Sequence, residues 1–465
     1  PTAVINASLA GVYKTAKDMG ADTIYGIDGI SFENILFRAN GFYYLTEREH
    51  SQAAYNAKTC ISYKNAKSFH IKNCEFKDIA ECSVFLGSNV QNASIENCLF
   101  NNIGAQAVYV HGENIDINDP NVTKNITISN NLISEYGRTY FNAVAILVIH
   151  ANSVDITHNE IHDGYYTAIS VGWVWGYSHN VCYNNRICDN LIYNIGQGWL
   201  SDMGGIYMLG NQPNTVISGN VIHTVSADPE EGGYGGGGIY LDEGSSYMLV
   251  EKNLVYSCGS DSYHLHYGSY NTLRNNIFAL SGESQLRIVT APTRCTPDDG
   301  GQKTVDLCNN IILTDQKTCA LSYMRNTSTM DERNNTYWDL SFGGELYASK
   351  ETDINLSLSI KTAIRKGFIH SPIIADPMFR DAASFDFELS PDSPAIAAGF
   401  EPWDYSNAGT LSETTIGLST EGGNTAYNAN SAHVPMTPAK EQKRFLAEII
   451  NAIYFFFKTL FGSIC

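Results

Sequence analysis

The sequence predicts an all-β protein that folds as a right-handed parallel β-helix, a solenoid of stacked coils. The main observation is a six-residue pattern, apolar–x–x–Asn–x–apolar, whose copies start 23 to 34 residues apart. Its period-two alternation is typical of short strands rather than helices. One strand cannot bury its inner face alone, so the repeats must stack. A β-propeller, the alternative, needs about four strands in every 40–50 residues and its own blade motifs, which the sequence lacks.

The copies of the pattern share a polar or small residue at the fourth position. They read IKNCEF (71–76), IENCLF (95–100), ISNNLI (128–133), ITHNEI (156–161), ICDNLI (187–192), ISGNVI (217–222), VEKNLV (250–255), LRNNIF (273–278), LCNNII (307–312) and ERNNTY (332–337). The fourth position holds Cys74, Cys98, Asn131, Asn159, Asn190, Asn220, Asn253, Asn276, Asn310 and Asn335. Because stacked coils lie about 4.8 Å apart, neighbouring amides can reach each other, which predicts an asparagine ladder in a turn. Parallel strands are joined by right-handed crossovers, which sets the hand of the solenoid.

A second strand is expected after the asparagine in each coil. Its inward column consists of Val84, Val108, Ile169, Ile206, Ile239, Tyr263 and Leu286. Neighbours in a strand alternate faces, so the next position points outward: Phe85, Tyr109, Ser170, Tyr207, Tyr240, His264 and Arg287. Two positions further on, Asp242 and His266 also point outward. This register places Asp242 over His266 and Tyr240 over His264.

Two aspartates are the candidate catalytic groups. Asp202 and Asp242 each adjoin a Gly-Gly-Ile-Tyr sequence in neighbouring coils, and a carboxyl pair is what hydrolysis of a glycosidic bond requires. On a straight strand the two would lie about 23 Å apart, so pairing requires a bend near Met203-Gly204-Gly205, which glycines favour. Otherwise Asp202 caps the amides of a turn. Glu243, directly after Asp242, is the substitute catalytic residue.

Polar and aromatic side chains surround the candidate pair. Tyr207, Tyr240, His264, His266 and Arg287 are expected to bind substrate and to tune the carboxyl pKa values.

Two tryptophans, Trp173 and Trp175, occur one coil before Asp202 and alternate with Val174, so both should face the same way. They either stack on sugar rings or pack at the rim of the solenoid. The glycine-rich run at 232–238 is expected to form a lip beside the groove.

Composition limits the partners. The chain of 465 residues has 29 basic and 48 acidic residues, a net charge of −19, which argues against nucleic acid or an anionic membrane. The 11 cysteines show no zinc-ligand spacing, and several occupy core positions, so buried thiols are expected. We expect no metal and no cofactor. The chain opens at Pro1 without a signal-peptide pattern, and the cysteines do not indicate a compartment.

Three regions are expected along the chain. Residues 1–340 form the catalytic β-helix. Residues 341–438 hold the C-terminal coils, a cap with hairpin signals and a linker-like stretch. Residues 439–465 form an amphipathic helical tail. The tail is too short and too polar for a membrane span; it packs on the β-helix or self-associates, with interfacial membrane contact as the alternative.

Five motifs, in order along the chain, resemble glycoside hydrolase family 141. They are YYTAISVGWVWGY (165–177), GWLSDMGGIYMLG (198–210), GGIYLDEGSS (237–246), YHLHYG (263–268) and NNIFA (275–279). The resemblance extends over about residues 20–410 and implies a β-helical enzyme with α-L-fucosidase-like or xylanase-like activity on plant cell-wall glycans. It also implies that Asp202 and Asp242 are the catalytic carboxylates. A substrate of this class favours a secreted or cell-envelope protein.

Two other functions are compatible with a β-helix. A polysaccharide lyase would need a base such as Arg287 and often Ca²⁺ on clustered carboxylates. A non-catalytic solenoid would bind a glycan without turnover.

Overall fold

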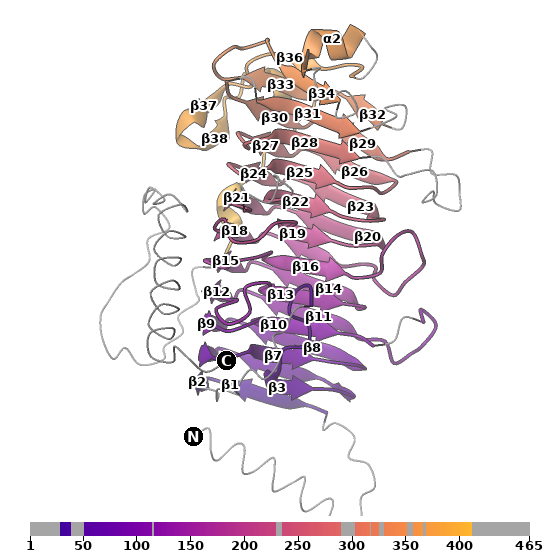
Figure 1. The fold of residues 1–465 in the computed structure, drawn as a ribbon, viewed down its shortest axis with the longest axis vertical. Coiled ribbons are helices and arrows are strands. Elements are labelled where there is room, and N and C mark those ends of the chain that lie inside the picture. Colours follow the sequence, from indigo (N-terminus) through magenta and orange to yellow (C-terminus); the bar gives the residue numbers. More distant parts are fainter. Residues whose placement is uncertain are drawn as a thin grey trace, which may run out of the picture. The chain divides into compact units, whose positions relative to one another are not determined.

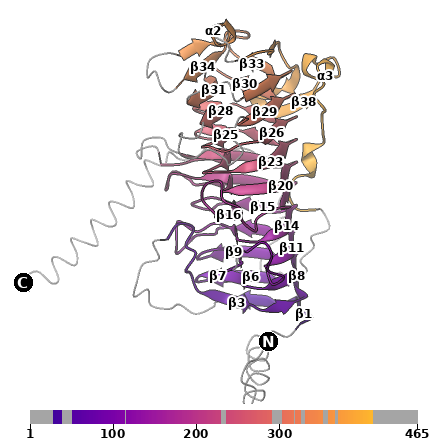
Figure 2. The same ribbon diagram turned by 90° about the vertical axis from the view of Figure 1, so that its right-hand side faces the viewer.

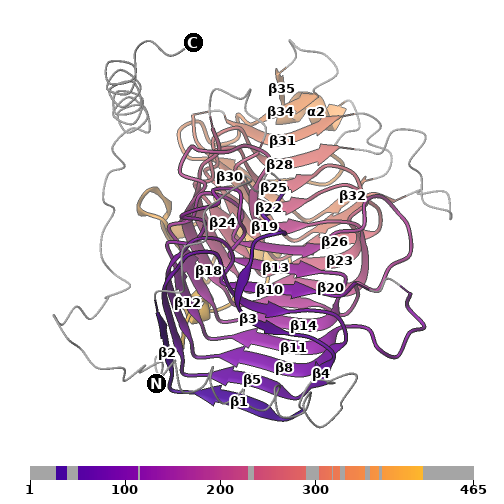
Figure 3. The same ribbon diagram turned by 60° about the horizontal axis from the view of Figure 1, so that its bottom comes forward.

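The computed structural model describes residues 28–38, 51–113, 116–228, 235–289, 303–316, 318–324, 330–350, 357–365 and 369–411. Within these residues the chain winds into stacked coils, and strands of successive coils pair in parallel (Figure 1). Three long sheets run along the stack and enclose one core (Figure 3). The protein is therefore a right-handed parallel β-helix, as the sequence predicts. The expected helical tail at 439–465 lies outside the described residues.

Each complete coil contributes one strand to each sheet. Sheet 1 consists of β1 (Ile30–Glu33), β5 (Phe69–Lys72), β8 (Val90–Glu96), β11 (Lys124–Ser129), β14 (Asn152–Thr157), β17 (Arg186–Cys188), β20 (Asn211–Ser218), β23 (Ser246–Glu251), β26 (Asn271–Arg274), β29 (Val305–Cys308) and β32 (Met330–Arg333), with β4 (Ala66–Lys67) beside β8. Sheet 2 consists of β2 (Leu36–Arg38), β6 (Glu75–Ile79), β9 (Leu99–Ile103), β12 (Leu132–Ser134), β15 (Glu160–His162), β18 (Leu191–Ile195), β21 (Val221–Val225), β24 (Leu254–Tyr256), β27 (Ile277–Ala279), β30 (Ile311–Thr314), β33 (Thr336–Asp339) and β36 (Ile373–Ile374). Sheet 3 consists of β3 (Thr59–Tyr63), β7 (Cys82–Leu86), β10 (Val108–His111), β13 (Ile146–Ile149), β16 (Ile169–Gly172), β19 (Gly204–Met208), β22 (Gly237–Leu241), β25 (Asp261–Leu265), β28 (Ser284–Val289), β31 (Cys319–Met324), β34 (Tyr347–Lys350) and the antiparallel β35 (Ser357–Ser359).

The six-residue pattern covers a turn between two sheets rather than one strand. In ISNNLI, β11 ends at Ser129, Asn130 adopts a φ of 54°, and β12 begins at Leu132. Most residues at the position of Asn130 likewise have positive φ, which asparagine tolerates better than most side chains. The alternation in the sequence continues through this turn, so the strands of sheet 2 were not distinguished from those of sheet 1.

The predicted asparagine ladder is present from Asn131 to Asn335. Each side-chain amide donates to the side-chain carbonyl of the next asparagine at 2.9 or 3.0 Å. These carbonyls also accept the backbone N–H of the preceding asparagine. Because unpaired polar groups in a core are costly, the ladder fixes the turn between sheets 1 and 2 in each coil.

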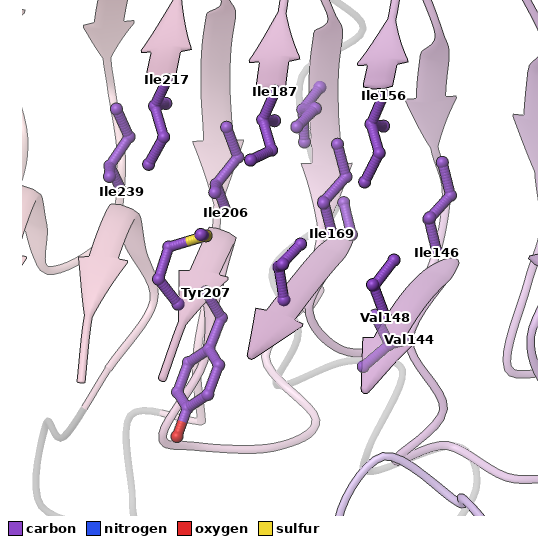
Figure 4. Packing of buried hydrophobic residues seen from close by; sticks show 14 of the residues in the cluster. Val144, Ile146, Val148, Ile156, Ile169, Ile187, Ile206, Tyr207, Ile217 and Ile239 are labelled. Carbon is purple, nitrogen blue, oxygen red and sulfur yellow. The ribbon is translucent and has the colours of Figure 1, made fainter. Parts of the chain in front are cut away.

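The inward column of sheet 3 is also as predicted. Strand register pairs Ile169 with Ile206, Ile206 with Ile239, and Ile239 with Tyr263. Figure 4 shows these isoleucines facing Ile187 and Ile217 of sheet 1, while the ring of Tyr207 points away from that aliphatic column. The outward residues Tyr207, Tyr240 and His264 therefore lie outside the aliphatic column, although each is itself buried.

The segment after the last coils covers the outer face of sheet 2. α2 (Ile360–Arg365) precedes it at the end of the stack, where Ile360 joins the core between the sheets. The segment on sheet 2 contains the hairpin β37 (Phe379–Asp381) and β38 (Asp386–Leu389) around η2 (Ala382–Ser384), then α3 (Pro394–Ala397) and η3 (Tyr405–Asn407). Phe387 and Phe400 pack on outward apolar residues of sheet 2 such as Leu254. The chain then runs back along the stack (Figure 2), where Gly409 N donates to Asp189 O at 2.8 Å. The expected hairpin is present, and it lies along the solenoid.

Neither a bilayer-spanning helix nor a metal-binding group of three or more His, Cys, Asp or Glu residues occurs in the described residues. The cysteines in this part of the chain are free, and most are buried.

Candidate active site

The candidate site lies on the outer face of sheet 3, across β19, β22, β25 and β28, which Figure 1 shows one above another. Strand register places Tyr207 beside Tyr240, Tyr240 beside His264, and His264 beside Arg287. This is the outward line that the sequence predicts. The two aromatic rings of Tyr240 and His264 are stacked, with centroids 4.4 Å apart.

Asp242 directly follows β22 and is the most heavily hydrogen-bonded group of the site. Its Oδ1 accepts a hydrogen bond from His266 Nδ1 at 2.7 Å and from the Tyr240 hydroxyl at 3.3 Å. Its Oδ2 accepts a short hydrogen bond from the Tyr207 hydroxyl. The predicted proximity of Asp242 and His266 is therefore present, with the side chain of Asp242 only 9% exposed.

These contacts decide the charge of Asp242. Burial favours the neutral acid, but hydrogen bonds from His266 and Tyr207 and the positive charge of His266 outweigh it. The pKa of Asp242 consequently lies below its usual value. Burial likewise opposes the charge on His266, yet bonding to Asp242 dominates and raises the pKa of His266. The two groups form a partly buried ion pair.

Asp202 reaches the same site because the chain bends at this residue. Asp202 has a φ of 55°, and β19 begins two residues later at Gly204. The bend therefore occurs at the aspartate, one position before the Met203-Gly204-Gly205 sequence expected to provide it. Its carbonyl accepts a hydrogen bond from the buried Tyr166 hydroxyl at 2.8 Å. A side chain at Gly235 would collide with the backbone of Asp202, so glycine is required for this close packing.

The carboxyl group of Asp202 has the opposite electrostatic setting to that of Asp242. Burial and the negative charge of Asp242 raise its pKa, and hydrogen bonding from Tyr240 only partly offsets this. Its Oδ1 is buried and has no hydrogen-bond partner among the described residues. The Tyr240 hydroxyl thus interacts with both carboxyl groups.

The Glu243 side chain is hydrogen-bonded to Tyr267 and not to the residues that contact the two aspartates. Its Oε2 accepts a hydrogen bond from the Tyr267 hydroxyl at 2.7 Å. Its backbone carbonyl accepts from Gly176 N and Gly210 N, which fixes the loop after β16 to the site. Glu243 lies at the edge of the site and does not share the hydrogen bonds of the two aspartates.

His264 and Arg287 belong to a buried polar cluster at the C-terminal side of the site. Burial and the neighbouring Arg287 lower the pKa of His264 to about 3, so this ring is neutral. Arg287 Nε lies 2.8 Å from Asp261 Oδ2, and its Nη2 lies 2.6 Å from Glu283 Oε2. Burial raises the pKa of Asp261 to about 6, against the influence of Arg287. Arg287 is therefore held in position by two carboxylates, next to His264.

Sequence reasoning did not find Asp261. It lies two residues before the inward Tyr263 in β25, a position that strand alternation gives to the core side, where a carboxylate is not expected. The signal that could have found it is Arg287, because a cation on a buried strand needs a carboxylate partner.

Trp173 and Trp175 differ in solvent exposure. β16 ends at Gly172, and Trp173 then adopts a φ of 82°, so the expectation that both rings face the same way does not hold. Trp173 is buried, with its indole N–H donating to Ser170 Oγ at 3.0 Å. Trp175 is 50% exposed and contacts the ring of Trp173 edge-on. Trp175 is the ring available to a ligand. Of the glycine-rich run expected to form a lip, residues 232–234 lie outside the described residues, while Gly237 and Gly238 are the first residues of β22 and are buried.

Comparisons with known proteins are consistent with the repeat fold. The family model described as "Right handed beta helix region" matches residues 59–202 and 145–284. The chain is 29% identical over 193 residues to the uncharacterized protein YwoF of Bacillus subtilis (strain 168), which covers 35% of this chain. The matched part amounts to 41% of that protein, so the chain spans well under two thirds of its relative.

Several solved structures are similar to parts of the chain. A protein described as "Glycoside hydrolase" is 27% identical, with a TM-score of 0.42 and coverage of 47% of this chain and 38% of that one. The tailspike protein of E. coli bacteriophage HK620, solved with a hexasaccharide, is 12% identical, with a TM-score of 0.38 and coverage of 62% and 55%. XylC, solved with xylose, is 12% identical, with a TM-score of 0.35 and coverage of 69% and 53%.

Proposed function

We propose that this protein is a glycoside hydrolase whose catalytic groups are Asp202 and Asp242. The observation that carries the proposal is that two neighbouring carboxyl groups, linked through Tyr240, have pKa values shifted in opposite directions. Carboxyl pairs whose environments separate their pKa values are typical of acid–base catalysis at neutral or mildly acidic pH.

The roles follow from the charges. Burial and the charge of Asp242 raise the pKa of Asp202, so of the two aspartates it is the one suited to act as the general acid on the glycosidic oxygen. Asp242, held ionised by His266 and Tyr207, acts as the base or the nucleophile.

Three further residues position this pair. The Tyr207 hydroxyl and the His266 imidazole hold the Asp242 carboxylate from two sides, which limits its rotation. Tyr240 connects Asp242 with Asp202 and is itself stacked on His264. Preorganised dipoles and charges of this kind contribute most of the barrier reduction in many enzymes.

The substrate class comes from the resemblance to family 141. It suggests plant cell-wall polysaccharide, either fucosylated pectin or xylan, and the half-exposed Trp175 is assigned as a contact to such a chain. Glu243, tied to Tyr267, is assigned a binding role at this edge.

The decisive experiment is to incubate the purified full chain with soluble xylan and with fucosylated pectin fragments. The proposal expects new reducing ends or free fucose, measured by chromatography, and no unsaturated sugar. The absence of any released sugar from both substrates, together with measurable glycan binding, would instead identify a non-catalytic solenoid.

A polysaccharide lyase is the competing reaction. Its product contains a carbon–carbon double bond that absorbs ultraviolet light, and a chelator would abolish a calcium-dependent lyase. The base that a lyase would use, Arg287, is held by Asp261 and Glu283 at 2.8 and 2.6 Å. These ion pairs stabilise the protonated guanidinium, which is the wrong charge state for a base.

A further inference from the structure

Three aromatic side chains gather at the edge of sheet 3 where its strands begin. Phe141, Tyr165 and Trp199 come from the sheet 2-to-sheet 3 turns of three successive coils. Their ring centroids lie 5.0, 5.2 and 5.5 Å apart, with planes inclined by 58–64°. Phe141 remains 40% exposed, and the other two rings are half-buried. Clustered rings exposed in this way mark binding surfaces more often than single exposed residues do.

The aromatic cluster is continuous with the candidate active site. Trp199 precedes Asp202 by three residues, so their Cα atoms are at most about 11 Å apart. Tyr166, the neighbour of Tyr165, holds the carbonyl of Asp202 at 2.8 Å. The same turns therefore position the rings and the general acid, and an oligosaccharide at the carboxyl groups would extend over the cluster.

The turn that carries Trp199 is held firmly. Gly196, Gln197 and Gly198 all have positive φ, at 76°, 50° and 74°. Gly198 N donates to Ser226 O at 2.9 Å, and Trp199 N donates to Gly196 O at 3.1 Å. Trp199 is thus presented from a backbone that is fixed to the next coil, which lowers the entropy lost when a ligand binds.

Tyr165 supports the two outer rings. The Arg138 guanidinium lies over its ring at 5.1 Å, and the same Arg138 is paired with Glu135 at 2.6 Å. One face of Tyr165 is therefore already occupied. Phe141 is exposed and Trp199 is partly exposed, so both rings keep surface that a ligand can contact.

We propose that Phe141 and Trp199 form a sugar-stacking subsite, occupied by a pyranose ring a few units from the bond cleaved between Asp202 and Asp242. The inference rests on the proposed function and extends it to a second contact region, on the Asp202 side. The face of an aromatic ring carries partial negative charge, and the C–H groups on the apolar face of a pyranose carry partial positive charge, so the two surfaces attract. No ionic contact is required, which suits an uncharged glycan.

The test uses the full chain carrying Asp242→Asn, so that polysaccharide is bound without turnover. Migration is measured by electrophoresis through gels containing soluble xylan or fucosylated pectin at a series of concentrations. Trp199→Ala and Phe141→Ala should each weaken binding by about three- to tenfold, the equivalent of one lost aromatic contact. Trp199→Phe, which keeps a ring, should retain most of the affinity.

The matched control is Tyr247→Ala. Tyr247 is 38% exposed and stacked on Tyr270 at 5.2 Å, but it belongs to sheet 1. This variant should bind as the Asp242→Asn parent does. Circular dichroism shows whether each variant is folded.

Two results would overturn the inference. One is that Trp199→Ala and Phe141→Ala migrate as Tyr247→Ala does in both gels. The other is that the Asp242→Asn parent is not retarded by either polysaccharide. Failure of the proposed function has a different signature, because the wild-type chain would then release no sugar or Asp242→Asn would keep its activity.

Discussion

His266 and Asp242 form an ion pair between adjacent coils, with Nδ1 2.7 Å from Oδ1 and the two side chains only 30% and 9% exposed. The pair raises the pKa of His266 and lowers that of Asp242, in both cases against the effect of burial. The pKa of nearby Asp202 is raised instead, first by burial and then by the negative charge of Asp242. The two aspartates therefore have pKa values shifted in opposite directions, and only Asp242 is hydrogen-bonded to His266.

Asp242→Asn should abolish turnover while leaving the fold intact. The amide keeps the size of the carboxylate but cannot act as base or nucleophile, so we expect kcat to fall by about a thousandfold or more. Asp202→Asn should behave alike. Sugar release measures the effect, and circular dichroism confirms folding.

Glu243→Gln is the matched control for the two aspartates. Its carboxylate contacts Tyr267 instead of the pair, so its effect should fall mainly on KM. Activity of Asp242→Asn above about a tenth of wild type would refute the assignment. An inactive Glu243→Gln beside a near-normal Asp202→Asn would transfer the acid role to Glu243.

The pH profile of kcat/KM should be bell-shaped with its maximum on the acidic side. Activity needs Asp242 ionised, so it is lost as the pH falls through the lowered pKa of that group. It also needs Asp202 protonated, so it is lost as the pH rises through the raised pKa of that group.

Tyr240→Phe should move the alkaline limb of this profile to higher pH. The hydroxyl stabilises the Asp202 anion, so its removal makes the proton harder to lose. The phenyl ring keeps the stacking on His264. An unchanged alkaline limb, in a folded variant, would show that Asp202 is not the group titrating there.

Asn253→Ala should destabilise the protein by about 1–3 kcal/mol, because buried partners lose their hydrogen bonds. The Asn253 amide donates to Asn276 Oδ1 at 3.0 Å and to Ile217 O at 2.9 Å. Its carbonyl accepts from Asn220. Chemical denaturation measures the loss, with the exposed Asn121→Ala as control. Equal unfolding midpoints for the two variants would contradict a structural ladder at this coil.

The line of outward residues on sheet 3 could be predicted because strand pairing repeats with a fixed register. Once Ile206, Ile239 and Tyr263 were recognised as one inward column, Tyr240 had to lie beside His264. The approach of Asp202 could not be read in the same way, since it depends on the backbone torsion of one residue in an irregular turn.

Aromatic residues in turns were the other feature that the sequence left open. Phe141, Tyr165 and Trp199 have no common spacing, because the turns between sheets 2 and 3 differ in length from coil to coil. Their contact follows from the stacking of those turns, which periodicity does not describe. For the same reason, alternation failed to separate Trp173 from Trp175.

Trp173→Ala and Trp175→Ala should have different effects, although the residues are two positions apart. Trp173 is buried and its indole N–H is bonded to Ser170, so truncation should destabilise the protein by about 3–5 kcal/mol. Trp175 is half exposed, so its truncation should leave the melting temperature almost unchanged and raise KM for polysaccharide. Thermal unfolding and steady-state kinetics on the same preparations separate the two outcomes. If Trp173→Ala is stable but binds polysaccharide weakly, Trp173 is the ligand contact. If Trp175→Ala is severely unfolded, Trp175 instead contributes to packing around the loop after β16.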